Sequence, residues 1–372
     1  MALIKLNNRS SEDTAIHGRR NLIINGAMKV AQRGTTSTSD QFQTVDRFQA
    51  SNAGLDEAVT QEQHTLTSSG DTEVWNLGFR KSYKLTNGNQ TSGGGADDRV
   101  TMQYRIEGQD ITNSSWNYAS SSSDVTLSFW CKSSVAQNFY ARLQSYGSTN
   151  QVYVIETGSL TANTWTKITK TIPGASGVAF ENNNSLGALL EFIMFRGTNK
   201  TGTRALNVWE QYDTNIRVPD MTSTWYTTDD ATFEITGVQL EVGDTATSFE
   251  HRSFGEELAL CQRYYYEIDS FSADGSYTSL ILSRYTDASN NYSAVVRHPT
   301  IMRTGPTVSF QSGMRAHFPS VAITSGTFSA GGQTPSSAGI VCNPGTNTAA
   351  NRILYIDGDA TNTRKIYFDA EL

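Results

Sequence analysis

The sequence predicts a mostly β protein, and three observations point to that class. Charged residues make up only 17% of the chain, and its polarity comes from Ser, Thr, Asn, Gln and 30 glycines, a profile typical of strands and turns. The chain of 372 residues is longer than one ordinary domain with a single hydrophobic core, which indicates more than one β domain. Apolar residues alternate with a period of two along most segments, and one segment shows helical spacing. We therefore expect an N-terminal arm (1–24), an antiparallel β-sandwich of the jelly-roll type (25–250), a short linking helix (251–269) and a small C-terminal β-sandwich knob (270–372).

The arm is polar with scattered apolar side chains, and a segment of this kind cannot build a core by itself. It is either a disordered tail or an arm that docks onto a partner. In the second case its apolar residues would make the contacts. These residues are Leu3, Ile4, Leu6 and Ile16.

Two segments show what kinds of strand the sandwich should contain. In "VTLSFWC", Val125, Leu127 and Phe129 share one face, and the other face is more polar, which is the pattern of a half-buried strand. The segment "LLEFIMFR" (189–196) is apolar on both faces, as expected for a central strand that is covered on each side. Clusters of Gly, Asn and Ser separate such segments and predict turns and loops.

The apolar phase changes inside "TFEITGVQLEV". Phe233 and Ile235 are odd-numbered, whereas Val238 and Leu240 are even-numbered, so the phase flips at Gly237. A glycine at such a point predicts a β-bulge, which keeps apolar side chains on one face of a bending strand. Curved antiparallel sheets of this kind are typical of jelly rolls.

One helix is predicted, from Phe254 to about Tyr266. Ser253 and Glu256 form a capping box, in which each side chain accepts a hydrogen bond from a backbone N–H that lacks a partner in the helix. Apolar residues then recur at helical spacing and form a stripe. The stripe consists of Phe254, Leu258, Cys261 and Tyr265. We expect it, together with Tyr264 to Tyr266, to pack at the junction between two β domains.

Composition and motifs argue against several classes of function. The net charge is −7, and the sequence shows no stripe of basic residues that could contact the phosphates of a nucleic acid. No segment has the roughly 18 apolar residues of a membrane span, and the start of the chain lacks the apolar core of a signal peptide. The motifs HExxH and GxSxG and the Walker loop are absent, so we expect a non-enzymatic protein without a cofactor.

The sequence does not assign a metal site. Three widely spaced cysteines and five scattered histidines form neither a disulfide framework nor a zinc site. Acidic pairs in loops leave a structural calcium ion in the first β domain open, but its ligands stay unknown.

Several aromatic residues fall in or beside polar loops. Sugars present apolar C–H faces, so exposed rings beside amide and carboxylate groups can form a glycan platform. The alternative is that these rings pack beneath loops. The candidates are Trp116, Tyr118, Tyr140, Tyr146, Trp209, Tyr212, Trp225 and Tyr226.

Seven segments carry a resemblance to known proteins. They are "RRNLIINGAMKVAQRGT", "VDRF", "LSFWCKSS", "NTWTKITKTIPG", "GVQLEVGDTATSFEHRSFGEELALCQRYYY", "RHPTIMRTGPTV" and "IYFDAEL". Together they resemble bacteriophage virion proteins of the tail fibre or appendage type. The part from "VDRF" to "SFEHR" also looks like a carbohydrate-binding-module jelly roll, a fold whose members bind glycans through exposed aromatic side chains, often with structural calcium.

The resemblance implies a homotrimeric fibre of the virion, assembled in the host cytoplasm. Its N-terminal arm would anchor it to a tail adaptor, a baseplate or the capsid, and its C-terminal domain would face the host surface. In such a trimer the helical stripe would lie near the axis and help to set the register. The resemblance carries no catalytic residue and fixes no sugar-contacting position.

Residues and resemblance together predict a non-enzymatic virion protein that binds host-surface polysaccharide, with no nucleic acid partner and no membrane insertion. Weak sites on three chains would reinforce one another through multivalency. Two alternatives stay open. One is a structural or decorating virion protein, and the other is a polysaccharide depolymerase, whose usual long repetitive β-helix this sequence does not show.

Overall fold

The computed structural model describes residues 20–269, 282–285, 291–318, 321–323, 327–343, 354–357 and 364–372. The chain forms two compact units, one of residues 1–257 with Leu372 and one of residues 258–371. Antiparallel sheets build both units, so the predicted mostly β fold is confirmed. The predicted docking residues of the arm, Leu3, Ile4, Leu6 and Ile16, lie outside the described residues.

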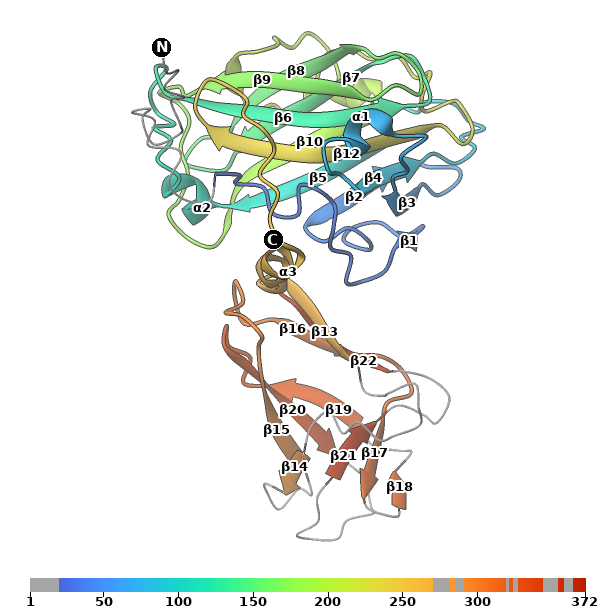
Figure 1. Ribbon diagram of the computed structural model, residues 1–372, viewed down its shortest axis with the longest axis vertical. Helices are drawn as coiled ribbons and strands as arrows, with labels where there is room; N and C mark the ends of the chain where they lie inside the picture. The colour runs from blue at the N-terminus through green and yellow to red at the C-terminus, as the bar shows by residue number, and fades with distance from the viewer. Residues whose placement is uncertain are drawn as a thin grey trace, which may run out of the picture. The chain divides into compact units, whose positions relative to one another are not determined.

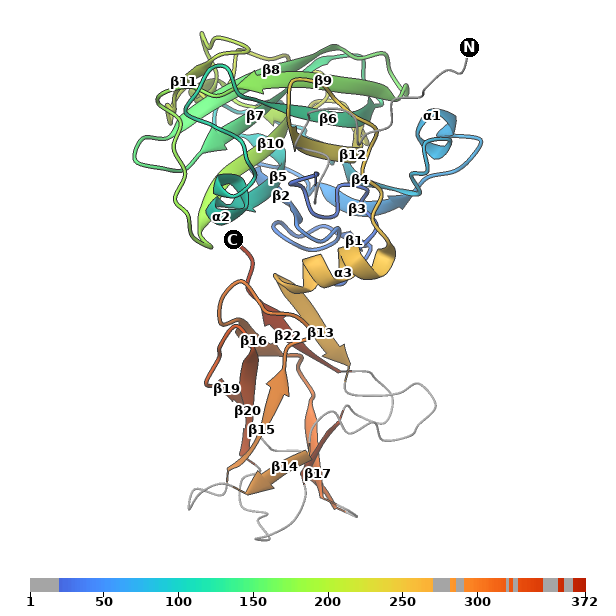
Figure 2. The ribbon, with the colours of Figure 1, turned by 60° about the vertical axis from the view of Figure 1, so that its left-hand side comes forward.

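Two six-stranded sheets lie face to face in the first unit (Figure 1). Sheet I has the order β1 (Thr36–Ser37), β3 (Thr60–Thr65), β4 (Lys81–Thr86), β12 (Thr232–Val242), β6 (Asp124–Ser133) and β9 (Thr166–Pro173). Sheet II has the order β11 (Trp209–Gln211), β8 (Gln151–Ser159), β7 (Asn138–Ser145), β10 (Leu186–Arg196), β5 (Arg99–Glu107) and β2 (Phe48–Ala53). Short helical turns connect some strands: α1 (Thr72–Trp75), α2 (Gly108–Thr112) and a 3-10 turn (Thr198–Lys200). In Figure 2, α2 lies at the end of β5 and β10, which it contacts.

The core of the first unit fills the space between the two sheets. The rings of Phe129 on β6 and Phe192 on β10 are 4.9 Å apart, and those of Phe139 and Phe233 are 4.8 Å apart. All four side chains are at most 1% exposed. Full burial of such a ring contributes roughly 1.5–3 kcal/mol, so these cross-sheet pairs hold the sandwich together.

The bulge expected in β12 is confirmed. The register between β12 and β6 shifts between Thr236 and Gln239, and Gly237 has a φ of +62°. A Cβ atom at Gly237 would lie 2.6 Å from Cζ of Phe79. Both the backbone conformation and the close approach of Phe79 therefore require glycine.

The strand "VTLSFWC" is more buried than its alternation predicts. Thr126 is 0% and Ser128 is 4% exposed, although both face away from the core. The outer face of sheet I is covered by a second apolar cluster that includes Phe79 and Trp165, with Trp130 of β6 packed against it. Long-range packing thus buries a face that looks polar in the sequence.

Residues 20–30 fasten β12 to the end of the first unit. Asn21 Oδ1 accepts a hydrogen bond from the backbone N–H of Leu240 (3.1 Å). The backbone N–H of Asn25 donates to Glu257 Oε1 (2.5 Å). Two of the quoted segments that resemble virion proteins, at 19–35 and 237–266, are therefore in direct contact in this fold.

Residues 21–24, which the sequence assigns to the arm, belong to the interior of the first unit. Ile23 is 0% and Ile24 is 2% exposed. The backbone N–H of Ile24 donates a hydrogen bond to the hydroxyl of Tyr104 (2.7 Å). The sandwich therefore includes residues before position 25.

The predicted helix is confirmed as α3 (Phe254–Gln262), and it ends earlier than expected. Its capping box is present, because the Ser253 N–H donates to Glu256 Oε2 (2.9 Å) and the Glu256 N–H donates to Ser253 Oγ (3.3 Å). Tyr265–Asp269 forms strand β13 instead of a last helical turn. The boundary between the two compact units falls within α3, after Glu257.

The four residues of the predicted stripe are divided between two elements. Phe254 is 58% exposed, Leu258 is half-buried, and Cys261 and Tyr265 are buried. Because Tyr265 lies in β13, the prediction of a single helical stripe is wrong at this residue. A role of these residues at a domain or trimer junction stays a prediction.

The described residues of the second unit form a three-stranded and a seven-stranded sheet. The smaller sheet has the order β13, β22 (Lys365–Asp369) and β16 (Thr307–Phe310), and Figure 2 shows these strands side by side. The larger sheet has the order β18 (Val321–Ile323), β17 (Arg315–Phe318), β21 (Leu354–Asp357), β14 (Leu282–Tyr285), β15 (Tyr292–Arg297), β20 (Ser337–Asn343) and β19 (Thr327–Gly331).

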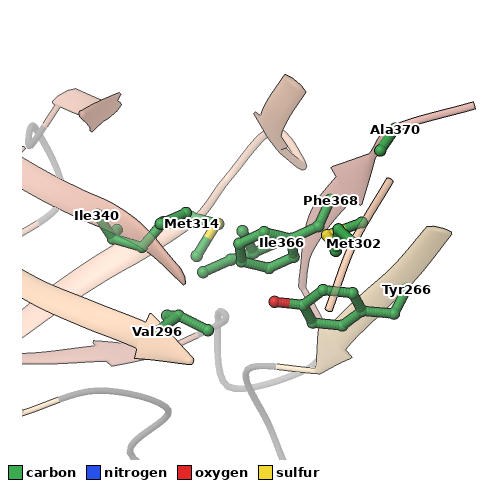
Figure 3. Close-up of a cluster of buried hydrophobic side chains, with 9 residues drawn as sticks. Tyr266, Val296, Met302, Met314, Ile340, Ile366, Phe368 and Ala370 are labelled. Atoms are coloured by element: carbon green, nitrogen blue, oxygen red, sulfur yellow. The ribbon is translucent and has the colours of Figure 1, made fainter. Parts of the chain in front are cut away.

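The core of the second unit gathers side chains from both of its sheets (Figure 3). The rings of Tyr266 and Phe368 stack with a centroid distance of 4.5 Å and an interplanar angle of 2°. The Tyr266 hydroxyl bonds to Nδ1 of His298 (2.7 Å). Tyr266 is therefore packed and hydrogen-bonded in the interior of this unit.

Candidate functional site

Four of the eight predicted sugar-contacting rings lie in the interior of the first unit. The exposed fraction is 0% for Trp225, 1% for Tyr226, 4% for Trp116 and 9% for Tyr140. Trp225 Nε1 donates to the Thr232 carbonyl (3.0 Å), which fixes the ring beneath its loop. The exposed ring faces that a glycan platform needs are absent at these four residues.

The other four rings are half-buried, and two of them pack against a neighbouring aromatic ring. Tyr118 packs edge-on against Phe180, with ring centroids 5.0 Å apart. Trp209 packs against Tyr153 at the edge of sheet II, with ring centroids 5.4 Å apart. The remaining two, Tyr146 and Tyr212, lie beside the outer face of sheet II, near Arg142.

A chain of side-chain hydrogen bonds crosses that outer face. Gln49 Nε2 donates to Gln103 Oε1 (2.9 Å), and Gln103 Nε2 donates to Glu191 Oε1 (2.9 Å). Arg142 Nε donates to Glu191 Oε2 (2.5 Å), and Arg142 Nη1 donates to Gln144 Oε1 (2.8 Å). The chain spans β2, β5, β10 and β7, which are neighbours in sheet II. We call the following residues the polar ladder: Gln49, Gln103, Arg142, Gln144, Glu191 and Arg196.

Glu191 is the centre of the polar ladder. It is 0% exposed, and it also accepts a hydrogen bond from Arg196 Nη2 (2.7 Å). Burial alone would raise its pKa, but the guanidinium groups of Arg142 and Arg196 outweigh burial and hold the pKa of Glu191 well below its ordinary value. The carboxylate is therefore ionised at neutral pH and cannot act as the acid that protonates a leaving group.

Residues 197–221 cover one side of this face. Their Val218 is 0% exposed and packs with Tyr140, Val154 and Ile193 of the sheet. Backbone hydrogen bonds hold the segment in place, including the bond from the Tyr212 N–H to the carbonyl of Asn150 (2.9 Å). The covering segment positions Tyr212 beside the polar ladder.

Tyr146 and Tyr212 form the rim of the polar ladder. The Tyr212 ring lies 5.5 Å from Cζ of Arg142 and 5.8 Å from Cζ of Arg217. Burial raises the pKa of Tyr146, and its hydroxyl also lies within the electrostatic influence of Arg142 and Tyr212. Every ladder side chain except Gln103 is at most 3% exposed, so a sugar would contact the two half-buried rings through its C–H face, and the ladder beneath would hold those rings in place.

Two pockets elsewhere in the first unit lack aromatic lining residues. One of about 300 Å³ lies beside Asp40 and Asn52, and the Asp40 carboxylate is already bonded to the Asn52 backbone N–H and to its Nδ2. The other, of about 270 Å³, lies beside Gln109 and Asn113 of the α2 region. Neither pocket contains a residue that the sequence nominates.

The described residues contain no group of three or more His, Cys, Asp or Glu side chains that could hold a metal ion. A structural calcium ion therefore stays a prediction without assigned ligands. The three cysteines are buried and not disulfide-bonded, and burial raises the pKa of Cys131 and of Cys342 to about 12. In the part of the chain that is described, no helix combines the length and apolar character of a membrane span.

Sequence reasoning names Tyr146 and Tyr212 but misses the polar ladder. A signal was available in "NFYARLQSY", where Tyr140, Arg142, Gln144 and Tyr146 alternate with core residues. A second signal was Glu191, the single charge inside the apolar part of "LLEFIMFR". A charged residue in a central strand needs buried partners, and those partners lie on other strands.

No family model matches the chain, and no curated protein matches its sequence. Among solved structures, the chain is similar to the enzymatically active domain of bacteriophage CBA120 tailspike protein 4, with 11% identity and a TM-score of 0.31. That match covers 60% of this chain and 21% of the tailspike, so the chain spans about a fifth of its length.

Two carbohydrate-binding domains are also similar. The N-terminal cellulose-binding domain of β-1,4-glucanase C from Cellulomonas fimi has 10% identity, a TM-score of 0.29, and coverage of 59% of this chain and 99% of that chain. The family 11 carbohydrate-binding module of a cellulosomal cellulase of Clostridium thermocellum has 12% identity, a TM-score of 0.27, and coverage of 59% and 98%. These likenesses assign no site residue to this chain, so the candidate site is described from the residues of this chain alone.

Proposed function

We propose that this chain is a non-enzymatic glycan-binding protein and that the outer face of sheet II holds the sugar. The observation that carries the proposal is the pairing of Tyr146 and Tyr212 with a hydrogen-bonded ladder that crosses four strands. A ladder that is fixed before binding keeps the rim side chains in one arrangement, which lowers the entropy lost on binding.

We further propose that the protein is a homotrimeric fibre or appendage of a phage virion that uses this face for adsorption to host polysaccharide. The resemblance of the quoted segments to virion proteins supports this assignment. The residues before Asn21 would supply the anchor to a tail adaptor, a baseplate or the capsid, since residues 21–24 are packed in the first unit. The protein would act in the virion, without inserting into a membrane or binding nucleic acid.

Glycan binding is tested with an array of bacterial and plant polysaccharides and the full chain. Tyr146→Ala and Tyr212→Ala should each weaken binding about twofold to tenfold, because stacking on one ring contributes roughly 0.5–1.5 kcal/mol. Tyr118→Ala is the control, since Tyr118 is a half-buried tyrosine that packs on Phe180 and makes none of the recorded contacts with the polar ladder. Equal losses of binding affinity in all three variants would contradict the proposal. The absence of binding to any polysaccharide at millimolar concentration of binding sites would contradict it as well.

The trimer is tested by mass photometry of the purified chain. Three copies of the 40.8 kDa chain should appear as one species of about three times that mass at micromolar concentration. A single species at 40.8 kDa would rule out a stable homotrimer without touching the glycan proposal.

Two other functions have distinct outcomes. A polysaccharide depolymerase would release reducing ends from host polysaccharide, whereas we expect none, because Glu191 is ionised and shared between two arginines. A purely structural virion protein would bind no polysaccharide, and excess recombinant protein would leave phage adsorption unchanged.

A further inference from the structure

Positive charge exceeds negative charge at the centre of the proposed glycan site. Arg142 and Arg196 share the single carboxylate of Glu191, with nearest N–O distances of 2.5 and 2.7 Å. All three side chains are at most 2% exposed, so this group holds one net positive charge below the surface. Arg196 Nε is also buried without a hydrogen-bond partner.

A third guanidinium adds to this charge at the rim. Arg217 is half-buried beside Tyr212, and its electrostatic influence reaches Arg196 together with that of Arg142. Arg217 Nε has no hydrogen-bond partner among the described residues of the chain. Arg142, Arg196 and Arg217 thus outnumber the carboxylate of Glu191, and when Arg204 is counted with its neighbours Glu210 and Asp213, four guanidinium groups face three carboxylates and one positive charge is in excess.

Arg204 of the same segment differs from Arg217 in having a carboxylate beside it, although the Nε atoms of both lack a hydrogen-bond partner among the described residues. Its Nε lies 3.1 Å from Glu210 Oε2, and its Nη2 donates to the Gln211 carbonyl (2.9 Å). Arg217 sits in the same covering segment without such a carboxylate. A buried or half-buried guanidinium is stabilised by an anion, and its planar fork matches the two oxygens of a carboxylate.

We infer that the ligand of this face is an anionic polysaccharide, bound with an acidic group at Arg217 and a sugar ring against Tyr212 or Tyr146. This inference rests on the proposed glycan-binding function of the same face. The net charge of the whole chain, −7, would repel an anionic polymer, so the local arginines must supply the attraction.

The test compares two pairs of polymers that differ mainly in charge, together with two further anionic polymers. Binding of the full chain is measured by biolayer interferometry to free and methyl-esterified polygalacturonate, to alginate and hyaluronate, and to dextran with and without sulfate groups. We expect binding to the anionic members to exceed binding to their neutral counterparts at least tenfold, and to weaken as salt rises from 50 to 500 mM.

Arg217→Gln keeps most of the side-chain length and removes the charge. It should weaken binding of the anionic polymers about tenfold or more, because one charge-assisted hydrogen bond contributes roughly 1.5–3 kcal/mol. It should also flatten the salt dependence. Arg80→Gln is the control, since Arg80 also lies over an aromatic ring (Trp75, 3.7 Å) but is exposed and belongs to the 66–81 region of the first unit.

The outcomes separate the two proposals. Binding that is equal for neutral and anionic polymers, or confined to neutral ones, would overturn the inference and leave glycan binding intact. Equal losses in Arg217→Gln and Arg80→Gln would overturn the placement of the anion at Arg217. No binding to any polymer or to the wider array would overturn the proposed function itself. A sulfate-only response would assign the anionic group to sulfate instead of carboxylate.

Discussion

Glu191 holds the outer face of sheet II together, because two buried guanidinium groups depend on its carboxylate. Removing one member of a buried charged network leaves the others unpaired in a medium where charge is poorly solvated. Within the described parts of the chain, Arg142 and Arg196 have no second carboxylate among their hydrogen-bond acceptors.

We predict that Glu191→Gln lowers the free energy of unfolding by about 3 kcal/mol or more. Urea denaturation followed by circular dichroism measures the change. Glu181→Gln, at an exposed carboxylate of the same unit, should shift the free energy by less than about 0.5 kcal/mol. Similar small shifts in both variants would show that the arginines find other partners.

The depressed pKa of Glu191 also gives the stability a dependence on pH. In the unfolded chain a glutamate titrates near pH 4.3, whereas in the folded chain the two arginines keep it ionised to lower pH. The stabilisation is therefore complete above about pH 4.3 and is lost as the pH falls below that value. Unfolding free energies between pH 6 and pH 3 should decline less steeply for Glu191→Gln than for the wild type, and parallel curves would contradict this assignment.

At the scale of single residues, the sequence shows where aromatic rings occur but not which of them are buried, and it shows charged networks poorly. Tyr146 and Tyr212 could be nominated because aromatic residues in polar loops are locally visible. Arg217 could not, because its neighbours Tyr212 and Arg196 become partners only when residues 197–221 fold back over the sheet. Trp225 was nominated for the same local reason as Tyr212, but tertiary packing buries it.

Among the elements, β12 depends on its bulge, and Gly237 carries two separate constraints there. Its φ of +62° disfavours any residue with a Cβ, and the ring of Phe79 occupies the place where that Cβ would lie. Gly158 has a similar φ of +72°, but nothing lies within 4 Å of its Cβ position.

Gly158→Ala should cost about 1 kcal/mol of unfolding free energy, from backbone strain alone. Gly237→Ala should cost about 2 kcal/mol more, because Phe79 must move as well. Chemical denaturation of the two variants measures the difference. Equal losses of unfolding free energy in the two variants would mean that the Phe79 ring can move aside at no cost. The bulge would then need glycine only for its backbone conformation.

The elements most local in sequence are the ones predicted best. The capping box of α3 and the phase shift of β12 each depend on fewer than about ten residues, and both are present as expected. The end of α3 was predicted wrongly, because Tyr265–Asp269 pairs with Lys365–Asp369 about a hundred residues later. Three consecutive tyrosines favour a strand, and that preference outweighs the helical spacing.

For the whole molecule, the division into two compact units predicts two cooperative unfolding steps. In differential scanning calorimetry, Glu191→Gln should lower the temperature of one transition. Ile340→Ala, in the core of the second unit at 0% exposure, should lower the other, since such a truncation costs roughly 2–5 kcal/mol. One transition that moves with both variants would contradict two separate units.

The contact between residues 20–30 and the end of the first unit has a consequence for synthesis on the ribosome. Asn25 and Glu257 are separated by 232 positions, and at roughly 5–20 residues per second the later one is made about 10–50 s after the earlier. Until Glu257 is made, the backbone N–H of Asn25 lacks its carboxylate acceptor. For most of that time strand β12, which residues 20–30 contact, has not been synthesised either. The first unit is therefore a late-closing domain during translation, however quickly its individual hairpins form.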